Sequence, residues 1–274
     1  GSAFPKGANM VEWKATDAAG RSAICQFTVT VSDGESPGLA CPANITRSAD
    51  AGLCSAAVTY ATPTYSDNCA GGGMALVPPS LSSGSTFPTG TSSVVWEATD
   101  AAGLTKRCTF TVTVNDTQQP NISCPANQTV GNTPGSCSAA VNYPIPTYSD
   151  NCVGGSAALQ SGLPSGGIFP KGQTTVVWRA TDAVGLTKTC SFRITVNDTE
   201  NPVIACPSSQ SKNTDAGLCT ALTTYSTPTA TDNCAPAPTV VRVSGPASGS
   251  AFSVGTTTCV WRSTDGASRA TCRS

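Results

Sequence analysis

Alternating apolar and polar residues predict β-strands along the whole chain. At 109–114, Thr-Phe-Thr-Val-Thr-Val places Phe and Val on one side and Thr on the other, which is the period of a strand with one buried face. The segment 93–99 likewise puts Val, Trp and Ala on one face. Between these two segments, Thr-Asp-Ala-Ala-Gly at 99–103 supplies the Asp and Gly typical of a hairpin turn. Because Pro and Gly interrupt every helical pattern, the sequence predicts an all-β fold.

The same pattern returns about every 82 residues, which indicates tandem repeats. The tryptophans hold one strand position in each repeat and are expected in the cores: Trp13, Trp96, Trp178 and Trp261. We divide the chain into the C-terminal half of a repeat at 1–33, complete repeats at 34–117 and 118–199, and a repeat at 200–274 that lacks its last strand. A complete unit has the length of a seven-stranded immunoglobulin-like (Ig-like) sandwich. The two interrupted units indicate a segment of a longer protein.

Fourteen cysteines recur with the same period, and none of them forms a Cys-x-x-Cys pair. A regular set of this kind predicts disulfides made in an oxidising compartment. Zinc is the alternative, but four-ligand zinc sites usually bring their cysteines in close pairs. We therefore expect small sandwiches stapled by disulfides, each contributing about 2–4 kcal/mol to stability.

Four cysteines in one unit allow three pairings, and the expected strand directions favour one of them. The second cysteine begins a strand and the third ends the next, so antiparallel strands would bring both to one pole of the sandwich. The first and fourth cysteines open strands that can run side by side in parallel, which brings them to one level. The predicted bonds are Cys41–Cys108, Cys54–Cys69, Cys124–Cys190, Cys137–Cys152, Cys206–Cys272 and Cys219–Cys234.

Two cysteines remain without a partner inside the sequence. Cys25 corresponds to Cys108, so its partner is expected in the missing first half of its own repeat. Cys259 lies two residues before a tryptophan, where the other repeats carry valine. We interpret Cys259 as a buried free thiol that replaces this valine, and an intermolecular or interdomain disulfide is the alternative.

The chain resembles the hyalin repeat, also called the HYR domain, in an ordered set of phrases: CPANIT at 41–46, AGLCSAAVTY at 51–60, PTYSDNC at 63–69, FPTGTSSVVWEATDAAG at 87–103 and CTFTVTVNDT at 108–117. The resemblance extends over essentially the whole chain. It implies an extracellular Ig-like module that occurs in tandem in adhesion, matrix and surface proteins. It implies no catalytic residues.

The composition excludes several classes of function. Histidine is absent, so neither Ser-His-Asp nor Cys-His catalysis is possible within the chain, and we expect no enzyme. The formal net charge of −1 gives no electrostatic reason to expect nucleic acid as a partner. No apolar stretch approaches the roughly 20 residues needed to insert across a bilayer.

The aspartates recur at fixed positions. Two sets are expected to cap turns, one in the hairpin turn and one directly before Asn-Cys: Asp17, Asp100, Asp182 and Asp265, and Asp67, Asp150 and Asp232. At the boundaries between repeats, Asp116, Asp198 and Glu200 are candidate Ca²⁺ ligands, because oxygen-rich linkers can bind this ion. No other metal or cofactor is expected.

The chain contains five Asn-x-Ser/Thr motifs, at Asn44, Asn115, Asn121, Asn127 and Asn197. In an exported protein these asparagines are candidates for covalent glycans. Only 11% of the residues are charged, so a layer of sugar would supply solubility that charge does not.

Together these observations predict an extracellular structural or adhesive protein, secreted or at the cell surface, whose repeats form a rod, a spacer or a fibre-forming subunit. Its expected partners are other protein subunits or molecules of the cell surface and matrix. Head-to-tail self-assembly by strand addition is one route to a fibre. The alternative is an accessory stalk of a larger secreted or surface-anchored enzyme or receptor.

Overall fold

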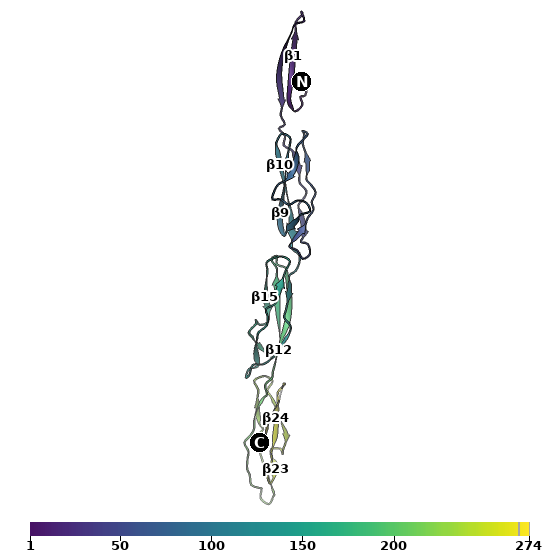
Figure 1. The fold of residues 1–274 in the computed structure, drawn as a ribbon. Coiled ribbons are helices and arrows are strands. Elements are labelled where there is room, and N and C mark those ends of the chain that lie inside the picture. The colour runs from purple at the N-terminus through teal and green to yellow at the C-terminus, as the bar shows by residue number, and fades with distance from the viewer. Residues whose placement is uncertain (268, 274) are drawn as a thin grey trace. The chain divides into compact units, whose positions relative to one another are not determined.

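The computed structural model describes residues 1–267 and 269–273, and it is built from β-strands (Figure 1). This confirms the all-β prediction. Within the described residues, no helix has the length and apolarity that crossing a membrane requires. The chain divides into two compact units, residues 1–118 with 150–153 and residues 119–149 with 154–274.

The first unit begins with a hairpin of β1 (Gly7–Thr16) and β2 (Ser22–Val31). The two strands pair antiparallel with Trp13 opposite Cys25. Trp13 is 68% exposed, although we expected every tryptophan in a core. The reason is that no second sheet faces this hairpin among the described residues.

The rest of the first unit contains one complete repeat. Its strands are β3 (Gly38–Ala40), β4 (Ile45–Ser48), β5 (Ser55–Ala57), β6 (Thr64–Ser66), β7 (Gly73–Leu76), β8 (Thr86–Pro88), β9 (Gly90–Thr99) and β10 (Thr105–Asn115). One sheet has the order β4-β10-β9-β7, in which β4 and β10 are parallel and the other neighbours antiparallel. Two further antiparallel pairs, β3-β6 and β5-β8, complete the Ig-like sandwich.

The core of this repeat lies between the strand pairs and the four-stranded sheet. Alternate side chains of β9 and β10 point inward, so Val94 and Val112 are fully buried and Phe110 is almost so. The ring of Tyr60 packs edge-on against Phe110 with centroids 5.0 Å apart. Its hydroxyl donates to the carbonyl oxygen of Leu81, which satisfies the polar end of a buried ring.

The second unit contains the next repeat, with the same topology. Its strands are β11 (Asn121–Ser123), β12 (Gln128–Gly131), β13 (Ser138–Val141), β14 (Thr147–Ser149), β15 (Ser156–Ser161), β16 (Gly167–Pro170), β17 (Gly172–Thr181) and β18 (Thr187–Asn197). The sheet order is β12-β18-β17-β15, with the pairs β11-β14 and β13-β16. Phe192, Val176 and Trp178 line the core, and Tyr143 packs edge-on on Phe192.

The last repeat, also in the second unit, has fewer strands. They are β19 (Val203–Ala205), β20 (Thr220–Thr223), β21 (Thr229–Thr231), β22 (Thr239–Ser244), β23 (Ser250–Ser253), β24 (Val260–Thr264) and β25 (Arg269–Arg273). We expected the final strand to be absent, but β25 pairs with β24 over five residues. β25 is short because it contains only the residues that precede the Phe-Thr-Val-Thr-Val segment of the motif, and the last repeat in the sequence does not include that segment.

Candidate functional site

The bonds between first and fourth cysteines of each repeat form as the strand directions predict. The structure joins Cys41 to Cys108, Cys124 to Cys190 and Cys206 to Cys272, with Cα atoms 5.7, 5.7 and 6.0 Å apart. In the first of these pairs, Cys108 lies on β10 opposite Trp96 of β9. Each bond therefore ties the start of a repeat to its last strand.

The second and third cysteines do not pair within a repeat, so three predicted bonds are wrong: Cys54–Cys69, Cys137–Cys152 and Cys219–Cys234. The prediction took the strands after the second cysteine and before the third to be antiparallel neighbours. In the structure β5 pairs with β8, and β6 pairs with β3. Because the two strands belong to different pairs, their cysteines do not meet.

Instead, the second cysteine of one repeat bonds to the third cysteine of the next repeat in the sequence. Cys54 is joined to Cys152, and Cys137 is joined to Cys234, with Cα atoms 4.8 and 5.0 Å apart. The sequence separations of 98 and 97 residues are close to one full period plus the spacing within a repeat. Cys152 and Cys234 are both buried.

The loop that carries Cys152 is held by side-chain hydrogen bonds within the first unit. Asp150 Oδ2 accepts from the Cys152 amide at 3.2 Å. Asn151 Nδ2 donates to the carbonyl oxygen of Leu53 at 2.9 Å and to Asp116 Oδ1 at 3.2 Å. The side chain of Asn151, the middle residue of Asp-Asn-Cys, thus positions this loop beside Cys54.

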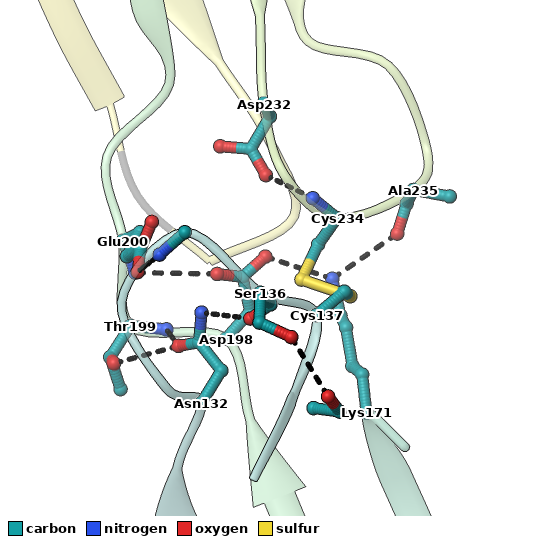
Figure 2. The surroundings of a disulfide bond; sticks show 12 residues. Asn132, Ser136, Cys137, Lys171, Asp198, Thr199, Glu200, Asp232, Cys234 and Ala235 are labelled. Carbon is teal, nitrogen blue, oxygen red and sulfur yellow. Dashed lines mark hydrogen bonds and ion pairs between the residues drawn. A yellow bond between two sulfur atoms is a disulfide. The ribbon is translucent and has the colours of Figure 1, made fainter.

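Figure 2 shows the equivalent site in the second unit, around Cys137–Cys234. Asp232 Oδ1 accepts from the Cys234 amide at 2.8 Å. The Lys171 ammonium lies 3.0 Å from Asp198 Oδ2 and donates to the carbonyl oxygen of Ala235 at 3.2 Å.

The candidate Ca²⁺ ligands of this site therefore already have partners. Asp198 is paired with Lys171, and its Oδ1 accepts from the Glu200 amide at 3.3 Å. The carboxylate of Glu200 accepts from the Gly135 amide at 2.6 Å. Asp198 and Glu200 consequently serve as hydrogen-bond acceptors that order the segments around the disulfide.

A third site of this kind lies near the start of the chain, where Cys69 is half-buried and unpaired. The Lys6 ammonium lies 2.9 Å from Asp33 Oδ2, and this hydrogen bond lowers the pKa of Asp33 and raises that of Lys6. Asp67 Oδ2 accepts from the Cys69 amide at 3.0 Å. The adjacent carboxylate of Asp33, followed by desolvation, raises the pKa of the Cys69 thiol.

Four cysteines are unpaired, two more than predicted. Cys25 and Cys219 are exposed, Cys69 is half-buried, and Cys259 is buried. The burial of Cys259 agrees with the interpretation that its thiol replaces a core valine. Its close packing against Gly245 supports this, because a Cβ on that glycine would lie 2.8 Å from Cys259 Sγ.

The recurrent aspartates cap turns as predicted. In the hairpin turns, the side chains of Asp17, Asp100 and Asp182 each accept from two backbone amides, and Asp265 accepts from the Ala267 amide. The aspartates before Asn-Cys each accept from the amide of the following cysteine.

The five candidate glycosylation asparagines are all exposed. Asn44 Oδ1 accepts from the Thr111 amide, and Asn127 Oδ1 accepts from the equivalent Arg193 amide. These two side chains are thus oriented by the neighbouring strand. Glycosylation of the five residues stays a prediction.

Comparison with known proteins places these features in a family. Residues 1–31, 32–114, 115–196 and 197–273 match the HYR domain. Hyalin of Strongylocentrotus purpuratus is 34% identical over 95% of this chain and 22% of its own length. Hyalin of Lytechinus variegatus is 33% identical over 85% of this chain and 44% of its own length. The chain thus spans less than half of either relative.

Two further matches are more distant. The "Sushi, von Willebrand factor type A, EGF and pentraxin domain-containing protein 1" of Rattus norvegicus is 32% identical over 62% of this chain and 5% of its own length. A solved structure of protocadherin gammaB7 EC3-6 is 15% identical over 97% of this chain and 84% of that chain, with a TM-score of 0.36. Because the four consecutive HYR matches extend over residues 1–273, the chain belongs to the HYR domain family.

Proposed function

We propose that this chain is a load-bearing spacer in an extracellular structural or adhesive protein, and that its disulfides make it nearly inextensible. The observation that carries the proposal is the disulfide pairing of successive repeats, Cys54–Cys152 and Cys137–Cys234. Membership of the HYR family and the adhesion-type relatives support an extracellular location and protein partners.

The bonds within repeats shorten the covalent path that tension would follow. A pulling force enters at Cys41, crosses to Cys108, and continues along 16 residues to Cys124. It then crosses to Cys190 and follows another 16 residues to the bond between Cys206 and Cys272. Only 32 of the 231 residues that separate Cys41 from Cys272 can therefore lengthen under load.

The bonds between repeats add a second covalent path. The loop closed by Cys54–Cys152 overlaps the loops closed by Cys41–Cys108 and by Cys124–Cys190. If Cys41–Cys108 is reduced, the load passes through Cys54–Cys152 instead of through an unfolded repeat. Loss of one bond thus lengthens the chain only slightly.

Single-molecule stretching of the oxidised and the reduced chain tests this proposal. At about 3.3–3.6 Å per extended residue, the segment from Cys41 to Cys272 should reach about 110 Å when oxidised and about 800 Å when reduced. Similar extensions in the two states would overturn the proposal.

A comparison of cysteine variants isolates the bonds between repeats. Replacing Cys41 and Cys108 by serine should lengthen the oxidised chain by about 90 Å, because the path through Cys54–Cys152 remains. The same replacement should add about 230 Å when Cys54, Cys152, Cys137 and Cys234 are also serine. Equal increments in the two backgrounds would show that these bonds carry no load.

The same pairing rule bears on self-assembly. Cys69 corresponds to Cys152, and Cys219 corresponds to Cys54, yet both are unpaired. In register, Cys69 would bond to the second cysteine of the repeat whose C-terminal half is residues 1–33. Cys219 would bond to the third cysteine of a following HYR repeat, supplied by another part of a longer protein or by a second molecule joined head to tail. The alternative role, a stalk within a larger enzyme or receptor, is supported by the rat relative, whose name combines several domain types.

A further inference from the structure

Three acidic clusters occupy equivalent positions beside the third cysteines. Each joins the aspartate that follows the last strand of a repeat to the aspartate of the next Asp-Asn-Cys loop: Asp33 with Asp67, Asp116 with Asp150, and Asp198 with Asp232. In every cluster, one carboxylate oxygen of each aspartate and the cysteine sulfur lie within 4.8 Å of one another. Placing two carboxylates this close is unfavourable unless a positive charge compensates them.

A lysine supplies that charge in two of the clusters. Both lysines occupy the third position of a Phe-Pro-Lys-Gly motif. Lys6 pairs with Asp33 at 2.9 Å, and Lys171 pairs with Asp198 at 3.0 Å. Figure 2 shows the Lys171 ammonium between Asp198 and the carbonyl oxygen of Ala235. The side chains of Asp33 and Asp198 are almost completely buried at these ion pairs.

The third cluster has no such lysine, because Thr89 takes its place in Phe-Pro-Thr-Gly. The Thr89 hydroxyl lies 3.2 Å from Cys54 Sγ and carries no charge. None of the five ion pairs within the described part of the chain includes Asp116 or Asp150. The cluster thus keeps both carboxylates and lacks the cation that its two equivalents contain.

One oxygen of each carboxylate in this cluster also lacks a hydrogen-bond partner. Asp116 is only 9% exposed, and its Oδ2 has no partner. Asp150 Oδ1 and Asn151 Oδ1 are likewise buried without a partner, but so are Asp232 Oδ2 and Asn233 Oδ1 beside Lys171. The distinguishing atom is therefore Asp116 Oδ2, because the corresponding oxygens of Asp33 and Asp198 accept from a lysine. A buried carboxylate oxygen without a partner is unfavourable, and a cation at Asp116 Oδ2 would remove this penalty.

We infer that Asp116 and Asp150 bind one Ca²⁺ ion, which takes the place of the lysine ammonium in the other two clusters. The available donors are all oxygens, and Cys152 is excluded as a thiolate ligand because it is in a disulfide. Ca²⁺ accepts carboxylate and amide oxygens in flexible arrangements of six to eight ligands, whereas Mg²⁺ demands a near-ideal octahedron. Water would complete the shell. The inference is independent of the load-bearing role proposed above, because its tests leave every cysteine and every disulfide unchanged.

Calorimetric titration of the oxidised full chain with Ca²⁺ tests the inference. We expect one site, with a dissociation constant on the order of 10⁻⁴–10⁻³ M as in other extracellular modules. Asp116→Asn should abolish binding. Thr89→Lys should abolish it too, because the new ammonium fills the site as Lys171 does in its own cluster. Absence of binding to the unchanged chain, or unaltered binding after Thr89→Lys, would overturn the inference.

The reverse substitution is the matched control. Lys171→Thr removes the ammonium beside Asp198 and Asp232, so the stoichiometry should rise from one Ca²⁺ to two. This gain cannot come from misfolding, which would only lose sites. A stoichiometry that stays at one would contradict the idea that the lysine substitutes for the ion. Tighter binding of Mg²⁺ than of Ca²⁺ would contradict the assignment of the ion.

Discussion

At the residue scale, single carboxylates decide how the cysteine loops behave. Asp33 is shared between Lys6, which lowers its pKa, and the neighbouring Cys69 thiol, whose pKa it raises. A thiol with a raised pKa contains less of the reactive thiolate at a given pH. Cys69 is thus protected from oxidation by its charged neighbour as well as by its partial burial.

The substitution Asp33→Asn should accelerate the reaction of Cys69 with iodoacetamide at pH 8. Removing the carboxylate takes away the main cause of the raised pKa, so the thiolate fraction increases. The rate is measured by mass spectrometry of the peptide that contains Cys69. Exposed Cys25 serves as the internal control and should react at the same rate in both proteins. An unchanged rate at Cys69 would contradict the prediction.

The same ion pair, between Lys6 and Asp33, makes the stability of the folded chain decrease at acid pH. Because the pKa of Asp33 is lowered in the folded chain, the pair contributes stability above the unfolded value of about 3.9, and this contribution is lost as the pH falls through the lowered pKa. Lys6→Met should therefore reduce the difference in stability between pH 7 and pH 2. Denaturant unfolding at the two pH values measures it, and an unaltered difference would show that the pair is neutral for stability.

At the scale of elements, one strand motif meets different environments in successive repeats. The phenylalanine of the long last strand is 2% exposed at Phe110 and at Phe192, but 49% exposed at Phe27. The strand patterns are the same, so the difference comes from the opposing sheet, which covers β10 and β18 and not β2. Burial of a periodic face is thus a property of the sandwich and not of the strand.

This contrast gives a matched pair of substitutions. Phe192→Ala should destabilise its repeat by about 3–5 kcal/mol, because it opens a cavity beside Tyr143 in a packed core. Phe27→Ala should cost less than about 1 kcal/mol, because half of that ring is already in water. Hydrogen exchange of peptides from β18 and β2 measures each effect locally. Equal effects at both positions would contradict the burial argument.

At the scale of the whole molecule, the cysteines connect the repeats into overlapping covalent loops. Five bonds are made and four thiols remain, and two of the five bonds reach from one repeat into the next. Small cores with few charges gain much of their stability from such bonds. The bonds also couple unfolding of one repeat to that of the next.

A disulfide map of the oxidised chain checks this connectivity. Proteolysis without reduction should yield a peptide that contains Cys54 joined to Cys152, and another that contains Cys137 joined to Cys234. Recovery of Cys54 joined to Cys69 would contradict the structure.

Labelling of thiols provides a second readout. Cys25 and Cys219 should react rapidly, Cys69 slowly, and Cys259 only after denaturation, because a buried thiol is inaccessible. Rapid labelling of Cys259 in the native chain would contradict its place in the core.

The sequence by itself determined the strands, the repeats and the pairing of first with fourth cysteines. These follow from local alternation, from periodicity and from strand direction within one sandwich. It also identified Asp116 as a candidate ligand, but not its partners Asp150 and Asn151. Those residues belong to the next repeat, and only folding brings them beside Asp116.

The tertiary structure alone decided the partners of the second and third cysteines. In a periodic chain, Cys69 and Cys152 have the same local sequence, so no local signal tells which of them Cys54 will meet. The choice depends on which strands pair, since β5 joins β8 and leaves Cys54 free to contact the loop of the next repeat. The spacing of the cysteines shows which of them are equivalent, whereas contact between successive repeats determines the partners of the second and third cysteines.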